Sequence, residues 1–387
     1  MSVLIEGSWD DARQIASATF SQLPAQLIAV ADCLGRTLAQ DVRSLVDLPT
    51  YATSAMDGYA VAGVGPWEII GEVKAGLPMK QALKDGQAVG IATGAVVPEG
   101  VFGVIRWEDA KVIGVQLSGE LVKNQDIRPP AHECTAGDVL IEAGTVLNPA
   151  MIGLLAAAGL DSVHVVNKPK VALVLLGDEI VLSGIPRDGL VRDALGPQLP
   201  GWLIAFGAEV ISTQYISDQL DLVISELQRA CESADIVITT GGTAQGPRDY
   251  LHDALIAIDA QILVDTVKVR PGHPMLLARK GKTAILGLPG NPQSAIVALA
   301  SLGQPVIASM LGQAEATLAT VLTASELTAP ENFTRLIIGN LKDGQFHIAP
   351  YLGSAMLRGL AHSNGFGIVT KPLTHAGEHI RWLDLPV

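Results

Sequence analysis

Strand-like and helix-like patterns alternate through residues 168–312. Residues 171–176 form an uninterrupted apolar run that is typical of a buried parallel strand. Residues 218–233 instead repeat apolar side chains at helical spacing, on one stripe made of Leu220, Val223, Ile224, Leu227 and Cys231. Further strands are expected at 209–216, 235–240, 262–267 and 283–288, and further helices near 198–206, 250–258 and 292–310. This alternation predicts a doubly wound, mostly parallel α/β domain.

The flanking segments have β texture. Between residues 44 and 128, short β-type runs at 59–61, 67–73, 87–91, 103–107 and 112–117 are separated by glycine and proline turns, which predicts a small β domain. Residues 1–20 predict a short helix, and residues 25–42 a helix that turns into a strand. A helix at 149–158 with proline in its first turn and a strand at 162–166 follow.

The predicted fold class is therefore α/β plus β, with small β domains on either side of a central α/β domain. A chain of 387 residues is long enough for two to four domains. We expect a small β domain at 44–128, an α/β domain from 1–20 and 168–315, and a C-terminal β domain at 316–387. Residues 21–43 and 129–167 form a discontinuous linker domain.

Composition narrows the classes of function. Hydrophobic residues make up 49% and charged residues 17%, which favours packed cores over disorder. The formal net charge of −13 disfavours binding to nucleic acid or to an anionic membrane. The three cysteines are far apart, and the first residues lack the pattern of a signal peptide, which favours a soluble, cytoplasmic protein. The apolar run at 294–311 is interrupted by Gly303, Gln304 and Pro305, which favours a buried helix over a membrane span.

Candidate chemistry gathers where the predicted strands end. Glu179 follows one strand and Asp218 another, a glycine-rich stretch from Gly241 to Asp249 follows the third, and residues 289–292 (PGNP) follow the fourth. Ligands of open α/β sheets bind beyond the carboxyl ends of the strands. Glycines let backbone N–H groups approach a ligand, and helix N-termini favour anions. The pattern predicts a phosphate site, with Mg²⁺ between the phosphate and the carboxylates.

Each of these signals also has an ordinary structural interpretation. Asp218 and Asp249 each precede a helix and could be N-caps, Glu179 could be a surface acid, and Gly290 and Pro292 could only make a turn. The chain contains neither a P-loop nor a dinucleotide-binding fingerprint, and it lacks the HExxH and GxSxG motifs. The case for a site depends on the expected convergence of these residues at one edge.

The order of several short motifs is more specific than any one of them. They are SAMDGYA at 54–60, TGA at 93–95, LGDE at 176–179, GG at 241–242 followed by Gly246 and Asp249, RPGHP at 270–274 and GLPGNP at 287–292. Together they resemble the MoeA/gephyrin family, the molybdopterin molybdenumtransferases, over nearly the whole chain. The resemblance implies a four-domain, elongated homodimer in which the linker domain contributes to dimerisation and the α/β domain binds molybdopterin.

The resemblance also implies an activity. Family members insert molybdenum from molybdate into adenylylated molybdopterin and release AMP in a Mg²⁺-dependent step. The site lies between the α/β domain of one subunit and the small β domain of the other. Molybdopterin adenylyltransferase is an expected partner.

Site residues follow from the matching positions. The resemblance implies that the catalytic residues are Asp57, Glu179, Asp218 and Asp249, and that the last three hold the metal. The implied substrate-binding residues are Thr93, Gly241, Gly242, Pro289, Gly290, Pro292, Arg270, His273, Ser294, Arg335 and Ser354. Of these, Ser294, Arg335 and Ser354 match the molybdate pocket, and Arg270 and His273 stand where the family usually has lysines.

Four departures from the family pattern leave a second interpretation open. Cys134 replaces an acidic position, Leu195 an asparagine, Ala244 a serine and Thr266 a lysine. A non-catalytic or specialised paralogue that binds the pterin nucleotide as a carrier or scaffold would tolerate such losses. A third hypothesis, a molybdopterin adenylyltransferase, leaves the two β domains without a purpose.

Overall fold

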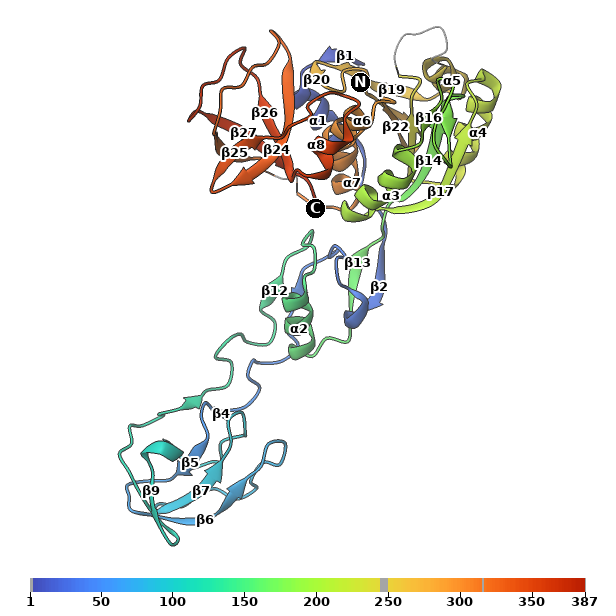
Figure 1. Ribbon diagram of the computed structural model, residues 1–387. Helices are drawn as coiled ribbons and strands as arrows, with labels where there is room; N and C mark the ends of the chain where they lie inside the picture. The colour runs from blue at the N-terminus through green and yellow to red at the C-terminus, as the bar shows by residue number, and fades with distance from the viewer. Residues whose placement is uncertain (1–2, 244–249, 315–316, 387) are drawn as a thin grey trace. The chain divides into compact units, whose positions relative to one another are not determined.

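The computed structural model describes residues 3–243, 250–314 and 317–386. The chain divides into two compact units (Figure 1). The first consists of Met1–Gln26, Gly35–Ala39 and Val165–Val387, and the second of Leu27–Leu34 and Gln40–His164. The finer division into four domains stays a prediction.

The first unit is built on a seven-stranded sheet with the order β1-β19-β21-β22-β18-β14-β17. Its strands are β1 (Leu4–Gly7), β14 (Lys170–Leu176), β17 (Glu209–Ile216), β18 (Ile236–Thr240), β19 (Gln261–Val267), β21 (Leu276–Lys280) and β22 (Thr283–Leu288). Every neighbouring pair is parallel except the two pairs that include β21. The prediction of a mostly parallel α/β sheet is confirmed.

Side chains of β14 alternate between two cores. Val171, Leu173 and Leu175 belong to one buried cluster, and Ala172, Val174 and Leu176 belong to the other. Successive strand residues point to opposite faces, so a strand covered on both sides is apolar throughout. The first cluster packs against helices α1 (Trp9–Thr19), α3 (Leu195–Ala205), α6 (Pro292–Ala298) and α7 (Gln304–Met310). The second packs against α4 (Leu220–Ser233) and α5 (Leu251–Ala257).

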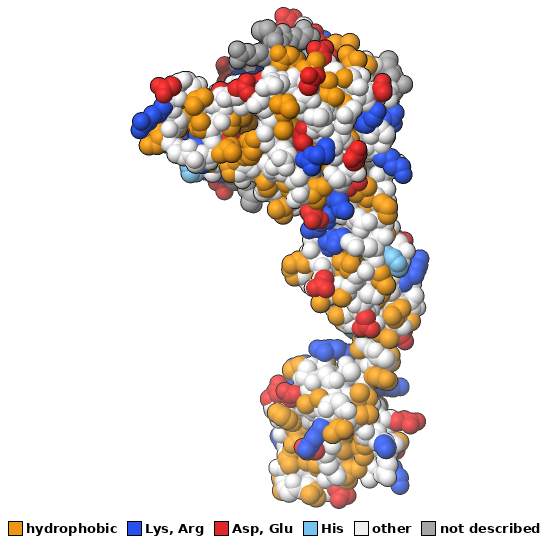
Figure 2. Space-filling model, turned by 90° about the vertical axis from the view of Figure 1, so that its right-hand side faces the viewer, with side chains coloured by type: hydrophobic (Ala, Val, Ile, Leu, Met, Phe, Trp, Pro, Cys, Tyr) orange, Lys and Arg blue, Asp and Glu red, His pale blue; other side chains and the backbone are white. Residues whose placement is uncertain are grey.

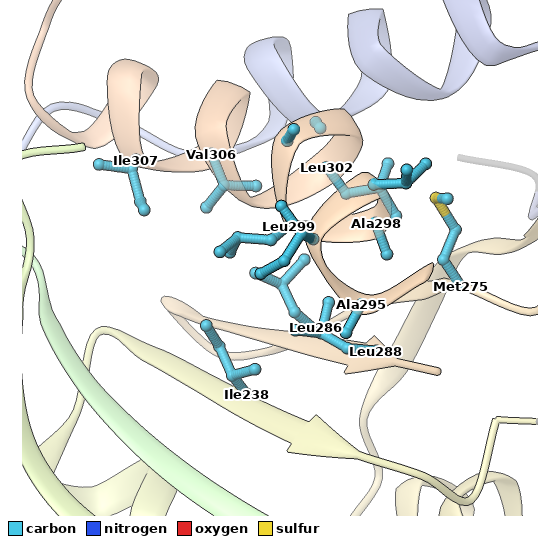
Figure 3. Close-up of a cluster of buried hydrophobic side chains, with 14 of the residues drawn as sticks. Ile238, Met275, Leu286, Leu288, Ala295, Ala298, Leu299, Leu302, Val306 and Ile307 are labelled. Atoms are coloured by element: carbon cyan, nitrogen blue, oxygen red, sulfur yellow. The ribbon is translucent and has the colours of Figure 1, made fainter. Parts of the chain in front are cut away.

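One continuous helical segment runs through α6, the π-helical turn η3 (Leu299–Gly303) and α7. Its apolar residues, including Leu299, face Leu286 and Leu288 of β22 and Ile238 of β18 (Figure 3). Pro292–Met310 is long and apolar enough to cross a membrane, but 83% of that stretch is buried inside the protein. This packing agrees with the prediction of a buried helix.

The C-terminal residues form a small barrel. The strands β24 (Thr334–Lys342), β25 (Gln345–Ile348), β23 (Ala319–Thr323), β27 (His379–Asp384) and β26 (Gly365–Val369) follow one another around it. An additional pairing of β24 with β26 closes the barrel, and β20 (Val269–Arg270) pairs with β24 at its edge. Helix α8 (Leu357–Ala361) packs near β24, and the barrel core contains Phe346 and Trp382, whose ring centroids are 5.6 Å apart.

The second unit contains a six-stranded sheet with the order β8-β5-β7-β6-β10-β9. Its strands are β5 (Gly58–Val61), β6 (Trp67–Val73), β7 (Gln87–Ile91), β8 (Gly103–Arg106), β9 (Lys111–Ile113) and β10 (Gln116–Ser118). Two two-stranded pairings complete the unit, namely β4 (Thr53–Ser54) with β11 (Ile127–Arg128) and β3 (Val42–Arg43) with β12 (Val139–Ile141). A third pairing, β2 (Ala25–Ala29) with β13 (Ser162–Val166), includes residues of both units. Helix α2 (Pro149–Ala157) begins after Asn148, whose side chain accepts a hydrogen bond from the N–H of Met151 at 2.9 Å.

Several secondary-structure predictions need correction. The segment 1–20, predicted as a helix, contains the strand β1 before α1, and the run predicted at 112–117 spans the two strands β9 and β10. Within 25–42, the expected helix is instead the strand β2, followed by the 3₁₀ turn η1 (Val30–Asp32), because residues 25–29 pair with a strand more than a hundred positions later. The strand expected after it corresponds to β3, which begins at Val42. The strand β21 was not predicted. It forms an antiparallel hairpin with β22, and Gly281 in the connecting turn has a φ of +60°, which suits glycine.

Acidic and basic side chains are mixed on the face of the protein shown in Figure 2. Red Asp and Glu side chains lie among blue Lys and Arg side chains on both units. On this face, the negative net charge of the chain is not gathered into one acidic patch.

Candidate functional site

A cavity of about 590 Å³ opens at the carboxyl ends of β14 and β18. Four of the predicted site residues line it, namely Glu179, Gly241, Gly290 and Pro292. Its wall also includes the last residues of the two strands, Leu176 and Thr240. The structure therefore brings the acidic loop after β14 together with both glycine-rich turns.

The two glycine-rich turns are in contact because their strands are neighbours in register. Thr240 of β18 pairs with Leu288 of β22, and the N–H of Gly241 donates to the carbonyl of Leu288 at 2.9 Å. A Cβ atom on Gly290 would lie 4.0 Å from the Cα of Gly241. The φ angles of +81° and +68° at Gly241 and Gly242 favour glycine. The turns thus present close-set backbone to the cavity.

The acidic loops come from β14 and β17. Glu179 is exposed, and its carboxylate lies close to the backbone of Gly177. A Cβ atom on Gly177 would lie 2.9 Å from Glu179 Oε2. The N–H of Asp218 donates to Asp178 Oδ1 at 3.3 Å, which connects the two loops. Asp249, like Ala244, lies outside the described residues. Among the described residues, no three His, Cys, Asp or Glu side chains form a metal site, and the predicted three-ligand set stays a prediction.

The cavity has one wall of which the sequence analysis named only Leu195. The strand β16 (Val191–Arg192) and the residues up to Leu195 form this wall. Arg192 is the one cationic side chain among the described residues that line the cavity. Asp193 Oδ1 accepts hydrogen bonds from the N–H groups of Leu195 at 3.0 Å and Gly196 at 2.9 Å. These bonds satisfy the first turn of α3 and hold the segment in place. An aspartate just before a helix is a recognisable cap signal, but nothing in the sequence placed Arg192 beside the cavity.

Tyr215 of β17 reinforces this wall and provides a pH-dependent test. Its hydroxyl donates to Asp193 Oδ2 at 2.7 Å, and burial, followed by this hydrogen bond, raises the pKa of Tyr215 to about 12 from 10.0. The neutral phenol therefore stabilises the fold below pH 10, and this contribution is lost as the pH rises toward 12. We therefore expect the thermal unfolding midpoint, measured by circular dichroism, to fall less between pH 10 and pH 12 in Tyr215→Phe than in wild type. Tyr51→Phe is the control, because Tyr51 is 62% exposed against 41% for Tyr215, and equal pH profiles for the two variants would contradict the assignment.

A second group of predicted residues lies where β20 joins the C-terminal barrel. Arg270 pairs in register with Arg335 of β24. The Arg270 guanidinium lies 5.1 Å from the ring centroid of Phe333, and the His273 ring centroid lies 5.4 Å from the same ring. Nδ1 of His273 is 2.7 Å from the carbonyl oxygen of Val267, so Nδ1 carries the proton in this contact. Phe333 was missed because it comes from a loop that reaches these residues only through strand pairing.

Ser294 and Ser354 connect this group to the cavity. The N–H groups of Gln293 and Ser294 donate to the carbonyl oxygen of Ser354 at 3.0 Å and 3.3 Å. A Cβ atom on Gly272 would lie 3.2 Å from the carbonyl oxygen of Ser294, so the turn after Arg270 packs against the start of α6. Ala355, next to Ser354, lines the cavity. The two predicted groups of the first unit are therefore adjacent.

Asp57 and Thr93 lie together in the second unit. Asp57 is exposed, and its Oδ1 accepts a hydrogen bond from the N–H of Thr93 at 2.7 Å. The loop before Asp57 is held by the N–H of Ala55, which donates to the carbonyl oxygen of Asp126 at 2.7 Å. The carboxylate of Asp126 accepts two hydrogen bonds from Arg106, at 2.8 Å and 3.0 Å, and this pairing lowers the pKa of Asp126. These hydrogen bonds hold the Asp57 carboxylate and the loop before it in one position.

Two of the departures have structural roles here. Thr266 Oγ1 accepts a hydrogen bond from the N–H of Glu6 at 3.2 Å and donates to the carbonyl oxygen of Asp265 at 2.6 Å. The Leu195 side chain is 7% exposed and belongs to the α/β core. Cys134 lies in the second unit, where its backbone pairs with that of Leu48.

The fold and this edge define the class of protein as an α/β ligand-binding protein with attached β domains. Residues 7–159 match the family described as the MoeA N-terminal region (domain I and II), and residues 172–309 match the one described as a probable molybdopterin binding domain. A molybdopterin molybdenumtransferase of a Nostoc species is 32% identical over 398 aligned positions, covering 95% of this chain and 90% of that protein. One from Staphylococcus aureus is 30% identical, covering 82% of this chain and 79% of its own.

A solved structure supports the same fold. The molybdopterin biosynthesis MoeA protein from Pyrococcus horikoshii superposes with a TM-score of 0.83 over 98% of this chain and 99% of that chain, at 21% identity. The chain belongs to the MoeA family, as the sequence motifs predicted.

Proposed function

We propose that the protein is a molybdopterin molybdenumtransferase, which inserts molybdenum from molybdate into adenylylated molybdopterin and releases AMP. Membership of the MoeA family supports this function. The observation that carries it is the 590 Å³ cavity, where two glycine turns, an exposed carboxylate and an arginine meet at the ligand-binding edge of the sheet. Such a function belongs to molybdenum cofactor biosynthesis in the cytoplasm.

The phosphate of the substrate would bind at this edge. The Gly241 and Gly290 turns let the ligand come close to the backbone, and Arg192 supplies a charged donor for a phosphate oxygen. Carboxylate oxygens are the donors that Mg²⁺ prefers, and Glu179 and Asp218 lie on the two connected loops. These two residues would hold the metal together with Asp249. The bound Mg²⁺ would neutralise phosphate charge that the carboxylates otherwise repel.

Molybdate would bind at the adjacent group. Arg270 and Arg335 lie side by side on paired strands and can donate charged hydrogen bonds to an oxyanion. Nδ1 of His273 is occupied by the Val267 carbonyl, and Nε2 lies 3.8 Å from Glu6 Oε1, so a cationic imidazole held by Glu6 would add a donor for the oxyanion. Ser294 and Ser354 complete this side of the site.

Asp57 and Thr93 would complete the site from a second copy of the chain. The hydrogen bond between them gives the SAMDGYA loop a fixed, exposed carboxylate that makes no ion pair among the described residues. An exposed carboxylate with this support suits a role in proton transfer or ligand positioning. The proposal therefore includes a homodimer with a shared site.

The direct test is to incubate the purified protein with adenylylated molybdopterin, molybdate and Mg²⁺ and to quantify AMP. Release of AMP that requires both molybdate and Mg²⁺ is the expected result. Measurable nucleotide binding without AMP release would instead establish the carrier or scaffold role that Cys134 and Ala244 suggest. Formation of adenylylated molybdopterin from ATP would establish the adenylyltransferase.

Arg192 gives a prediction for substrate affinity. We expect Arg192→Ala to raise the KM for adenylylated molybdopterin by about tenfold, the effect of losing a charged hydrogen bond at a partly exposed site. The kcat should change much less, because the phosphate contact exists before the reaction. Arg187→Ala removes an exposed arginine of the same loop and is the matched control. An unchanged KM for Arg192→Ala would show that the nucleotide is bound elsewhere.

A further inference from the structure

A second polar cavity of about 500 Å³ lies at the opposite end of the sheet. It is lined by Lys170 and Glu209, the first residues of β14 and β17, and by Asp235, which immediately precedes β18. Every residue of its lining belongs to the first unit. This cavity is separate from the proposed catalytic site, which lies where the same strands end.

Three cationic side chains face this cavity, namely Arg36, Lys168 and Lys170. None of them makes an ion pair within the described ranges of the chain. The gathering distinguishes them, because three of the 26 Lys and Arg side chains of a chain with a net charge of −13 line one cavity. The mutual repulsion of the three charges would be relieved by a bound anion.

Arg36 shows the shortage of acceptors most clearly. Its Nη2 donates to the carbonyl oxygen of Val166 at 3.0 Å, which fixes the guanidinium. Its Nε is buried and donates to no acceptor in the described part of the chain. A buried donor without a partner is uncommon in native structures, and an acceptor bound beside Arg36 would satisfy it.

The two carboxylates of the cavity compensate only part of this positive charge. Asp235 Oδ2 accepts a hydrogen bond from the backbone N–H of Lys170 at 2.9 Å, so Asp235 is engaged by the main chain. Glu209 is exposed at the start of β17. The cations outnumber the carboxylates by one. The side chains of Asn167 and Ser233 add neutral hydrogen-bonding groups.

We propose that this cavity binds a small, multiply charged phosphate-class anion, with Arg36, Lys168 and Lys170 as its charged donors. The volume is sufficient for a pyrophosphate group or a phosphorylated metabolite. The contributing residues come from the segment 23–26, from Arg36, from Asn167 and Lys168, and from the sheet and its flanks. A ligand bound across these segments would stabilise the folded chain in proportion to its concentration above the dissociation constant.

Titration of the full-length protein with inorganic pyrophosphate, followed by calorimetry, tests the proposal. EDTA is included because the carboxylates of the catalytic edge repel pyrophosphate when no Mg²⁺ is present. We expect wild type to bind pyrophosphate and Lys168→Ala/Lys170→Ala to bind it at least about tenfold more weakly, since two charged donors are lost. Lys111→Ala/Lys123→Ala removes two exposed lysines from the second unit and should bind like wild type.

The outcomes separate this site from the proposed transferase site. AMP release by Lys168→Ala/Lys170→Ala should equal that of wild type, and a matching loss of AMP release would overturn the assignment to a separate site. Absence of pyrophosphate binding by wild type, or equal binding by the two double variants, would also overturn the proposal. If wild type releases no AMP, the transferase function fails while the calorimetric comparison still decides this one.

Discussion

Glu179→Gln should lower the kcat for AMP release by about 100-fold or more, the range seen when a group that stabilises transition-state charge is lost. Glutamine keeps the size of the side chain and replaces an anionic oxygen by an amide, so it weakens a hard-cation site without creating a cavity. Glu179 is exposed and lines the 590 Å³ cavity, and its neutralisation should leave the stability of the α/β core unchanged. AMP is quantified over a range of Mg²⁺ concentrations, and the Mg²⁺ requirement should rise together with the loss of rate.

The matched control is Glu232→Gln in the last turn of α4, which removes the same charge from an exposed position outside the cavity lining. AMP release should be unaffected there. If Glu179→Gln retains the wild-type rate at every Mg²⁺ concentration, the carboxylate has no part in the reaction. A thermal unfolding midpoint that falls in Glu179→Gln would instead attribute the effect to structure.

The sequence predicted the sheet because the burial of each element leaves a pattern along the chain. Residues 171–176 are apolar at every position, since β14 has a core on both faces. The stripe on residues 218–233 appears in the structure as the face of α4 that packs on the second core, with Val223 and Leu227 fully buried. The convergence of loops at one edge then follows from parallel strand direction alone, which is why Glu179, Gly241 and Gly290 could be expected to meet.

Contacts between distant segments could not be read in the same way. The strand β2 is held by pairing with residues 162–166, and its own residues carry too little local pattern to oppose a helix prediction. Arg192 faces the cavity because Asp193 and Tyr215 anchor the segment, a geometry that depends on two elements. Phe333 contacts both Arg270 and His273, and the pairing of β20 with β24 brings these residues together. Such residues become visible only when the topology is known.

Two of the departures from the family pattern have a structural role that the sequence did not show. Thr266 and Leu195 are used by the fold, one in hydrogen bonds with neighbouring backbone and the other in the core. Neither role requires the residue type that the family carries. The positively charged Arg192 beside the glycine turns offers a donor that the family comparison alone did not reveal.

Mixing two inactive variants should restore activity if the site is shared between subunits. Asp57→Ala inactivates the contribution of the second unit and Glu179→Gln that of the first, and each variant alone should release almost no AMP. After dissociation and reassembly of equal amounts, half of the dimers carry one copy of each variant. Each mixed dimer has one intact site and one doubly defective site, so activity should return to about one quarter of wild type for random pairing in a symmetric dimer.

This experiment distinguishes a shared site from two independent ones because the two residues lie in different units of the chain. If each chain carried a complete site, every site in the mixture would keep one defect, and activity would stay at the level of the single variants. Reassembly of Glu179→Gln with Asp218→Asn is the control, since both residues lie in the first unit and no pairing can produce an intact site. Recovery in the first mixture but not in the second would place Asp57 opposite Glu179 across the dimer. Recovery in neither would leave the Glu179 edge as a site that does not use Asp57 of a second copy.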